Sequence, residues 1–219
     1  MPAPKEAGAG SCTQESTEVT GLSELDDLRL VAPAPARRPS KWFHREEMLA
    51  RLRGQQTLRR MRRHGLRAAP SVYMAGGCLI DPLWAWAISI GADTIISANV
   101  VIVAHDAAMR RQLGYTEIRA VTIGERCYLG AGVTVLPGTT IGDDSIVGAA
   151  SVVRGEIPSG VVVAGNPARV LQTVDEYRTR RAADIAQSPR HDKNAFAIDL
   201  PLREQIIAEI AAHGRAFVR

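Results

Sequence analysis

The sequence predicts an all-β core, a parallel β-helix of hexapeptide repeats that carries one protruding loop and is flanked by helical segments. Three observations predict it: an aliphatic residue at every sixth position, a small or β-branched residue four positions later, and a glycine directly after many of the aliphatic residues. A period of six fits neither an α-helix nor the two-residue alternation of an ordinary strand. The aliphatic positions are Ile90, Ile96, Ile102, Ile123, Leu129, Val135, Ile141, Val147 and Val153.

The small residues are expected to point, like the aliphatic ones, into a narrow prism whose flat walls are short strands. The glycines are expected where the chain turns a corner, because a turn often needs a residue without a Cβ. A β-sandwich would instead need turn signals about every 8 to 12 residues. The small positions are Thr94, Val100, Cys127, Val133, Thr139, Ser145 and Ser151, and the glycines are Gly91, Gly124, Gly130, Gly142 and Gly148.

Composition divides the chain into four segments. Residues 1–39 cluster Pro, Ala and Gly and are expected to be disordered or loosely attached. Residues 40–68 are expected to form a basic helical segment, 69–171 the β-helix domain and 172–219 a C-terminal helical extension. The last predicted helix, at 201–213, is expected to cap the open end of the prism or to contact another subunit.

Charge and cysteine usage restrict the partners and the compartment. Residues 41–67 carry nine Lys or Arg against two Glu, so they could contact a membrane surface or an acidic polymer, or pack beside the prism with a solvated arginine face. Nucleic acid is not expected, because no binding motif accompanies the charge. No membrane span or secretory signal is expected. Cys12, Cys78 and Cys127 lack metal-ligand spacing, which indicates reduced thiols, no metal and a cytoplasmic protein.

The repeat is interrupted after Ile102 by an excursion of about 15 residues, and a long loop in a strict repeat is more often functional than accidental. His105 stands at the root of this loop and is the only histidine of the repeat region. An imidazole can remove a proton from a hydroxyl or an amine near neutral pH. Position alone leaves two interpretations open, a catalytic base and a histidine without a catalytic role.

The segment 121–170 resembles the hexapeptide-repeat acyltransferases, most of all the galactoside, maltose and polysaccharide O-acetyltransferases. The motifs GTTIG, VGAASVV and AGNPAR carry the resemblance, in the right order and spacing. It covers roughly residues 76–171. It implies a left-handed β-helix, a homotrimer, acetyl-CoA bound between neighbouring prisms, and transfer of the acetyl group to a carbohydrate hydroxyl.

The resemblance also implies that the histidine at the root of the loop is the general base, and His105 is the matching residue. It would take the proton of the acceptor hydroxyl as that oxygen attacks the thioester, while backbone N–H groups hold the oxyanion. Asp106 is expected to face away, because successive residues of an extended chain point to opposite sides. A backbone carbonyl is therefore expected to orient the imidazole.

Four residues are assigned to acetyl-CoA by the same resemblance. Ala131 and Ala149 match small residues that line the pantetheine arm, and their separation by three hexapeptides places them on one face, one coil apart. Arg154 and Arg169 match basic positions near the nucleotide and are expected to meet CoA phosphates. A solvated charge at Arg154 and an ion pair at Arg169 remain alternatives.

The acceptor is the least defined part, because the loop differs in content from those of the sugar enzymes. Tyr115 could stack on a sugar ring, Arg110 could pair with an acidic acceptor, and Trp86 could line the acceptor end. Packing of these loop residues on a neighbouring subunit is equally open. Trp84 falls on the six-residue period and is expected in the core. Tyr128 replaces the tryptophan usual in the family beside the cofactor.

Three other functions, two enzymatic and one non-catalytic, are compatible with the same prism. N-acetylation of an amino sugar or an antibiotic amine is an open alternative to O-acetylation. Zinc-dependent hydration, as in γ-type carbonic anhydrases, needs three converging histidines and is disfavoured by the single His105. A non-catalytic scaffold would not need the histidine, the small-residue groove and the closing basic motif together.

Overall fold

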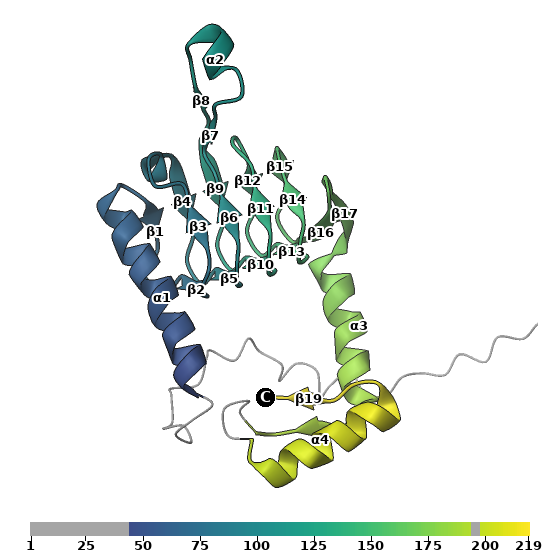
Figure 1. Cartoon of the computed structure of the whole chain (residues 1–219). Coiled ribbons are helices and arrows are strands. Elements are labelled where there is room, and N and C mark those ends of the chain that lie inside the picture. The colour runs from purple at the N-terminus through teal and green to yellow at the C-terminus, as the bar shows by residue number, and fades with distance from the viewer. Residues whose placement is uncertain (1–43, 194–197) are drawn as a thin grey trace, which may run out of the picture. The chain divides into compact units, whose positions relative to one another are not determined.

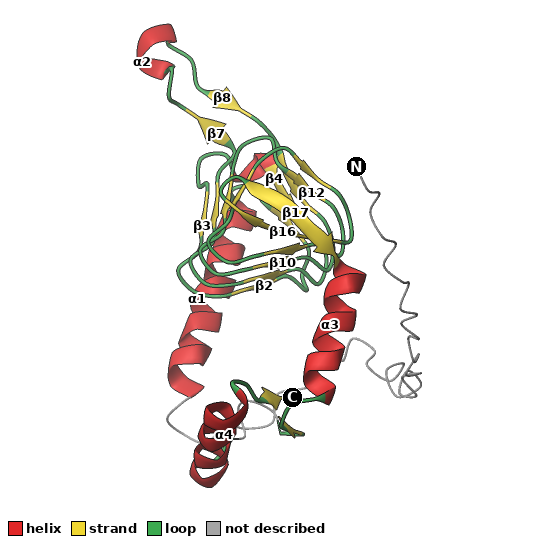
Figure 2. Cartoon of the chain, turned by 90° about the vertical axis from the view of Figure 1, so that its right-hand side faces the viewer, coloured by secondary structure: helices red, strands yellow, loops and turns green. Residues whose placement is uncertain are grey.

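The core of the protein is a parallel β-helix with a triangular cross-section, seen end-on in Figure 2. The computed structural model describes residues 44–193 and 198–219. Three parallel sheets form the walls, in the orders β1-β4-β9-β12-β15, β2-β5-β10-β13-β16 and β3-β6-β11-β14. The predicted fold class, an all-β left-handed parallel β-helix of hexapeptide repeats, is confirmed.

The strands of each wall are short and follow one another around the prism (Figure 1). The first wall contains β1 (Arg67–Ala68), β4 (Ile88–Ile90), β9 (Val121–Ile123), β12 (Thr140–Ile141) and β15 (Glu156–Ile157). The second wall contains β2 (Tyr73–Met74), β5 (Ile95–Ile96), β10 (Tyr128–Leu129), β13 (Ile146–Val147) and β16 (Val161–Gly165). The third wall contains β3 (Leu79–Ile80), β6 (Val101–Ile102), β11 (Thr134–Val135) and β14 (Val152–Val153).

The interior of the prism is built from the residues that the six-residue period predicts. Each predicted aliphatic position is at most 3% exposed, and each predicted small position at most 1%. The buried hydroxyls are satisfied by backbone carbonyls, as where Thr94 Oγ1 donates to Gly124 O of the next coil at 2.8 Å and Ser151 Oγ donates to Gly148 O of its own coil at 2.7 Å. The predicted core is therefore confirmed.

Most neighbouring coils pair with a shift of three hexapeptides, as between Leu129 and Val147, and the last coil is two residues shorter, as between Val147 and Val163. Two coils are longer: the coil from Met74 to Ile96 exceeds three hexapeptides by four residues, and the coil from Ile96 to Leu129 exceeds them by fifteen. The four extra residues lie around the 3-10 turn η2 (Ala85–Ala87), and the fifteen form the predicted protruding loop. Both insertions leave the prism at the corner between the third and first walls, called here the hairpin edge.

The loop is an antiparallel hairpin of β7 (His105–Asp106) and β8 (Glu117–Ile118) with the short helix α2 (Arg110–Leu113) at its far end. Its base is fixed to the prism by the backbone, because the Arg119 N–H donates to Ala104 O at 2.9 Å. The prism on both sides of the hairpin keeps its wall register. Insertion at a corner therefore leaves the packed interior unchanged.

The glycines after the aliphatic residues are required for a different physical reason from the one expected. None of the five has a positive φ. A Cβ on Gly130 would lie 2.6 Å from Ala149 N, and a Cβ on Gly91 would lie 2.6 Å from Glu125 N. The close stacking of consecutive coils, rather than the turning of a corner, excludes a side chain at these positions.

We expect Gly130→Ala to lower the free energy of unfolding by about 1–3 kcal/mol, because the added methyl group forces two coils apart. The matched control is Ala131→Ser, a change at the neighbouring exposed residue, with an expected effect within about 0.5 kcal/mol. Urea unfolding at one fixed protein concentration measures both. Equal midpoints for Gly130→Ala and the native chain would contradict the stacking explanation.

Helix α1 (His44–Arg63) packs on the first coil of the prism. Leu58 and Met61 are buried on its inner side, and Gly54 has no room for a Cβ because the backbone carbonyl of Met74 lies against it. Contact of residues 41–67 with a membrane surface or an acidic polymer stays a prediction, and residues 1–39 lie outside the described part of the chain. The exposed side of α1 carries Arg53, Arg59, Arg60 and Arg63.

The C-terminal end of the prism is crossed by β17 (Ala168–Thr173), which runs antiparallel to β16 (Figure 2). Helix α3 (Val174–Ala186) follows with a capping box between Thr173 and Glu176. The chain then forms β18 (Arg190–His191), α4 (Leu200–His213) and β19 (Phe217–Val218). No residue of α4 is buried, so the expectation that this helix caps the prism is wrong, and its contact with another subunit stays a prediction.

None of the helices in the described ranges combines the length and the apolar character that a membrane span requires.

Candidate active site

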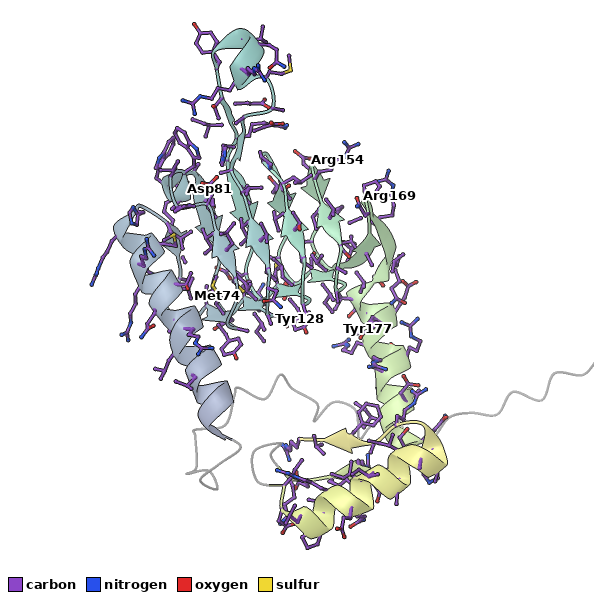
Figure 3. The ribbon with its side chains drawn as sticks, viewed as in Figure 1. Met74, Asp81, Tyr128, Arg154, Arg169 and Tyr177 are labelled. Carbon is purple, nitrogen blue, oxygen red and sulfur yellow. The ribbon has the colours of Figure 1, made fainter. Side chains whose placement is uncertain are left out.

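Asp81 and His105 form a hydrogen-bonded pair at the base of the hairpin, where Figure 3 labels Asp81. Asp81 directly follows β3 and His105 opens β7. The carboxylate Oδ2 accepts the hydrogen bond of the imidazole Nδ1 and a second one, of 3.2 Å, from the Ala104 N–H. The Asp81 side chain is 1% exposed and that of His105 is 33% exposed. A buried carboxylate thus holds an imidazole that solvent and ligands can reach.

The pair defines the tautomer of the imidazole. A carboxylate can only accept, so in the neutral form of the imidazole Nδ1 carries the proton and Nε2 keeps its lone pair. In this form Nε2 can take a proton from a hydroxyl or an amine placed against it. Arranged in this way, the pair meets the two structural requirements of a general base: an accessible lone pair and a fixed ring.

The expectation that a backbone carbonyl orients His105 is wrong, because Asp81 does so. Asp106 turns away as expected, and its Oδ1 accepts from the Ala108 N–H at 2.7 Å. Sequence reasoning missed Asp81 because it lies 24 residues earlier, in the preceding coil. The available signal in the sequence was a lone acidic residue directly after the apolar pair Leu79–Ile80, where the four-residue insertion begins.

Two tryptophans stand beside the pair. The ring centroids of Trp84 and His105 are 6.3 Å apart, and those of Trp84 and Trp86 are 5.8 Å apart with 69° between the planes. Trp84 is partly buried against the core and not inside it, which corrects the expectation from the period. The four-residue insertion removes it from the repeat. Trp86 is 52% exposed.

Ala131 and Ala149 stack in register at the corner between the second and third walls, called here the alanine edge. The Ala150 N–H donates to Ala131 O at 2.8 Å, and both Ala131 and Ala149 are exposed. Ala98 occupies the same position one coil earlier, since the Gly132 N–H donates to its carbonyl at 2.9 Å. The alanine edge is therefore lined by a straight column of methyl groups.

A comparison with the corner between the first and second walls shows that this turn does not itself require small residues. There the equivalent positions are Ala92, Glu125 and Asp143, of which the last two are exposed and carry long or charged side chains, and the backbone makes the same hydrogen bond, from Asp144 N–H to Glu125 O at 2.9 Å. Arg126 follows Glu125 and its guanidinium lowers the pKa of Asp144. The absence of long side chains on the alanine edge therefore needs a reason other than the fold.

Arg154 and Arg169 are exposed and lie on the same side of the prism as Asp81 (Figure 3). Arg154 stands on the hairpin edge itself, in the column Val103, Leu136, Arg154 defined by the wall register. Arg169 lies in β17, where its Nη1 donates to Ala168 O at 3.1 Å. Neither guanidinium has a carboxylate partner among the described residues, so both are free to bind an anion.

The structure does not bring all predicted site residues together within one chain. His105 is on the hairpin edge and the alanines are on another edge, with the third wall between them (Figure 2). Tyr115 and Arg110 lie at the far end of the hairpin, and Tyr115 is 83% exposed. A pocket of about 280 Å³ there is formed by the hairpin alone. It is lined by Asp106, Ala108, Met109, Leu113, Tyr115, Thr116 and Glu117.

Metal ligands and reactive thiols are not gathered at this site. Within residues 44–193 and 198–219, no three side chains of the His, Cys, Asp or Glu type come together as metal ligands would. Cys78 and Cys127 are free, and burial raises the pKa of each thiol. A raised pKa disfavours the thiolate, so neither of these two thiols is suited to act as a nucleophile.

Comparison with known proteins also identifies a hexapeptide repeat in this chain. Residues 120–155 match the family model described as bacterial transferase hexapeptide (six repeats). The chain is 41% identical over 97 residues to the putative lipopolysaccharide biosynthesis O-acetyl transferase WbbJ of Escherichia coli, covering 39% of this chain and 50% of that protein. It is 34% identical over 94 residues to the galactoside O-acetyltransferase of Escherichia coli, covering 42% and 46%.

The putative acetyltransferase YvoF of Bacillus subtilis is 39% identical over 93 residues, 42% of this chain and 52% of that protein. The chain thus spans about half the length of the curated relatives it matches. Among solved structures, a hexapeptide-repeat acetyltransferase of Vibrio cholerae complexed with acetyl coenzyme A has a TM-score of 0.46 and 26% identity, covering 50% of this chain and 60% of that one. The matched family model and the curated relatives confirm the resemblance to the hexapeptide-repeat acyltransferases.

We expect ¹⁵N NMR of the imidazoles to show His105 protonated on Nδ1 and unprotonated on Nε2 in its neutral form, because Asp81 accepts from Nδ1. Asp81→Ala removes that acceptor and should produce a mixture of both tautomers. The matched control is Asp106→Ala, which removes the neighbouring carboxylate and should leave the His105 signals unchanged. The same tautomer in native and Asp81→Ala protein would refute the orienting role.

Proposed function

We propose that the protein is an acetyl-CoA-dependent O-acetyltransferase that acetylates a carbohydrate hydroxyl, with His105 as the general base. The observation that carries the proposal is the buried Asp81 fixing a solvent-reachable imidazole at the base of the hairpin. The relatives support the class of reaction, because the matched proteins of Escherichia coli include a galactoside O-acetyltransferase and a putative lipopolysaccharide O-acetyl transferase. The repeat scaffold by itself does not need the pair.

The mechanism follows from the state of the imidazole. Nε2 of His105 takes the proton of the acceptor hydroxyl while the oxygen attacks the carbonyl carbon of the thioester. Asp81 stabilises the imidazolium that forms, since it already accepts from Nδ1. When the tetrahedral intermediate collapses, the C–S bond breaks, and the imidazolium returns the proton to the CoA sulfur. The acetyl group passes directly to the acceptor without an intermediate on the enzyme.

Acetyl-CoA would lie along the alanine edge. The column of Ala98, Ala131 and Ala149 leaves this edge free of long side chains, as a narrow pantetheine arm requires. Arg154 and Arg169 supply positive charge without carboxylate partners in the described ranges, which suits the phosphates of the nucleotide. Arg154 is two coils from the base of the hairpin, roughly 10 Å along the prism axis, given about 4.8 Å between coils.

The separation of the two edges supports a homotrimer in which each site lies between two chains. One chain alone presents the imidazole and the alanine column on different corners. A cyclic arrangement of three identical prisms can bring the hairpin edge of one chain to the alanine edge of the next. The apolar residues of the hairpin are available for that contact: Met109, Leu113 and Tyr115 are 53%, 64% and 83% exposed.

We expect His105→Ala to lower kcat for acetyl transfer by about 10²–10⁴, because the acceptor loses its general base. A thiol-release assay with acetyl-CoA and a panel of sugars, amino sugars and polysaccharide fragments measures it. The matched control is His64→Ala, a change at an exposed histidine outside the hairpin edge, which should keep native activity. Equal thiol release by His105→Ala and native protein would overturn the assignment. Faster turnover of amines than of hydroxyls would favour N-acetylation, the alternative from the sequence.

We expect Ala149→Leu to raise KM for acetyl-CoA by roughly tenfold or more, because a larger side chain fills the space proposed for the pantetheine arm. The control is Ala92→Leu, the equivalent position on the corner where Glu125 and Asp143 stand, which should leave KM for acetyl-CoA within about twofold. Isothermal titration with CoA gives the same comparison without turnover. An unchanged affinity in Ala149→Leu would remove the alanine edge from the cofactor site.

A further inference from the structure

The four-residue insertion around η2 is a second addition to the hairpin edge that the repeat does not need. The coil that contains it is four residues longer than the regular coil of three hexapeptides. It lies next to Asp81, directly before the coil that carries the hairpin. Both insertions therefore meet at the imidazole.

The insertion is anchored by buried residues although it lies outside the walls. Ala85 and Ala87 are 0% and 6% exposed and anchor the turn in the core. The residue between them, Trp86, packs closely on the turn that follows α1, because a Cβ on Gly65 would lie 2.7 Å from the Cβ of Trp86. Alternating buried alanines thus fix the position from which the Trp86 side chain leaves the prism.

The two indoles meet edge to face beside His105. Their planes meet at 69°, with 5.8 Å between the ring centroids, and the Trp84 ring lies 6.3 Å from the imidazole. Trp86 is 52% exposed and Leu83, at the start of the turn, is 75% exposed. Neither indole N–H has a hydrogen-bond partner in the described ranges, although Trp84 is partly buried. A partly buried indole N–H ordinarily finds a partner.

We propose that Trp84 and Trp86 form the acceptor subsite, in which the apolar C–H face of a pyranose ring stacks on Trp86 and a ring hydroxyl accepts from the free indole N–H of Trp84. The proposal rests on the proposed acetyltransferase function, since it names where that enzyme holds its acceptor. A ring seated against these indoles presents a neighbouring hydroxyl to Nε2 of His105. The indoles specify the acceptor class as a pyranoside with an exposed apolar face, and Tyr115 and Arg110 at the hairpin tip are not required for it.

The test combines turnover with direct binding. Methyl pyranosides and disaccharides are titrated into the native full chain, and the indole N–H signals of the tryptophans are followed by NMR. We expect Trp86→Ala to raise the acceptor KM and Kd by roughly five- to tenfold, with KM for acetyl-CoA unchanged within about twofold. Trp86→Phe, which keeps an aromatic face, should recover most of the binding. The matched control is Leu83→Ala, the other exposed apolar residue of the insertion, which should behave like the native chain.

The outcomes separate the subsite from the catalytic proposal. Sugar binding that shifts the Trp84 and Trp86 signals without any acetyl transfer would keep the subsite and overturn the proposed function. Native-like sugar binding by Trp86→Ala, or no sugar binding to the native chain, would overturn the subsite. Loss of the oligomer in Trp86→Ala, measured by light scattering, would also overturn it and show that the indoles form a subunit contact.

Discussion

The hydrogen-bonded register between coils is the constraint on which the rest of the structure depends. A shift of three hexapeptides per coil places equivalent residues directly above one another, so each corner of the prism becomes a straight column. The same register makes the interior intolerant of change, because every aliphatic position faces its counterpart in the next coil. Insertions at the corners leave this packing unchanged, and the imidazole and the alanine column of the proposed site lie at the corners.

Two corners carry the features that matter, and they differ in kind. The hairpin edge carries additions: a buried carboxylate, the imidazole that it orients and an aromatic turn anchored by two alanines. The alanine edge has no long side chains in any of its three coils, whereas the corner between the first and second walls carries Glu125 and Asp143 beside Ala92. The hairpin edge carries protruding side chains and the alanine edge leaves space for a ligand. Such a pair of surfaces suits a site formed between two subunits.

The fold was predictable because a period of six leaves few alternatives, and the protruding hairpin was predictable as the break in that period. His105 followed from its place at the break. Asp81 did not, because its contact with His105 crosses coils, and a local pattern says nothing about a partner 24 residues away. Trp84 was misplaced because the four-residue insertion shifts the period there. The glycines were correctly marked, but their physical reason, the approach of the next coil, is visible only in three dimensions.

In the proposed enzyme, the imidazole of one chain acts on a thioester held along the alanine edge of its neighbour. Mixing two separately impaired chains, His105→Ala and Ala149→Leu, and assaying them at acetyl-CoA well below the native KM tests it most directly. In a trimer with one site per boundary, some boundaries combine the native imidazole of one chain with the native alanine edge of the other. The account predicts that acetyl transfer returns to about a quarter of the native rate in an equal mixture refolded or co-expressed together. No recovery, in mixed trimers whose assembly is verified by light scattering, would contradict it.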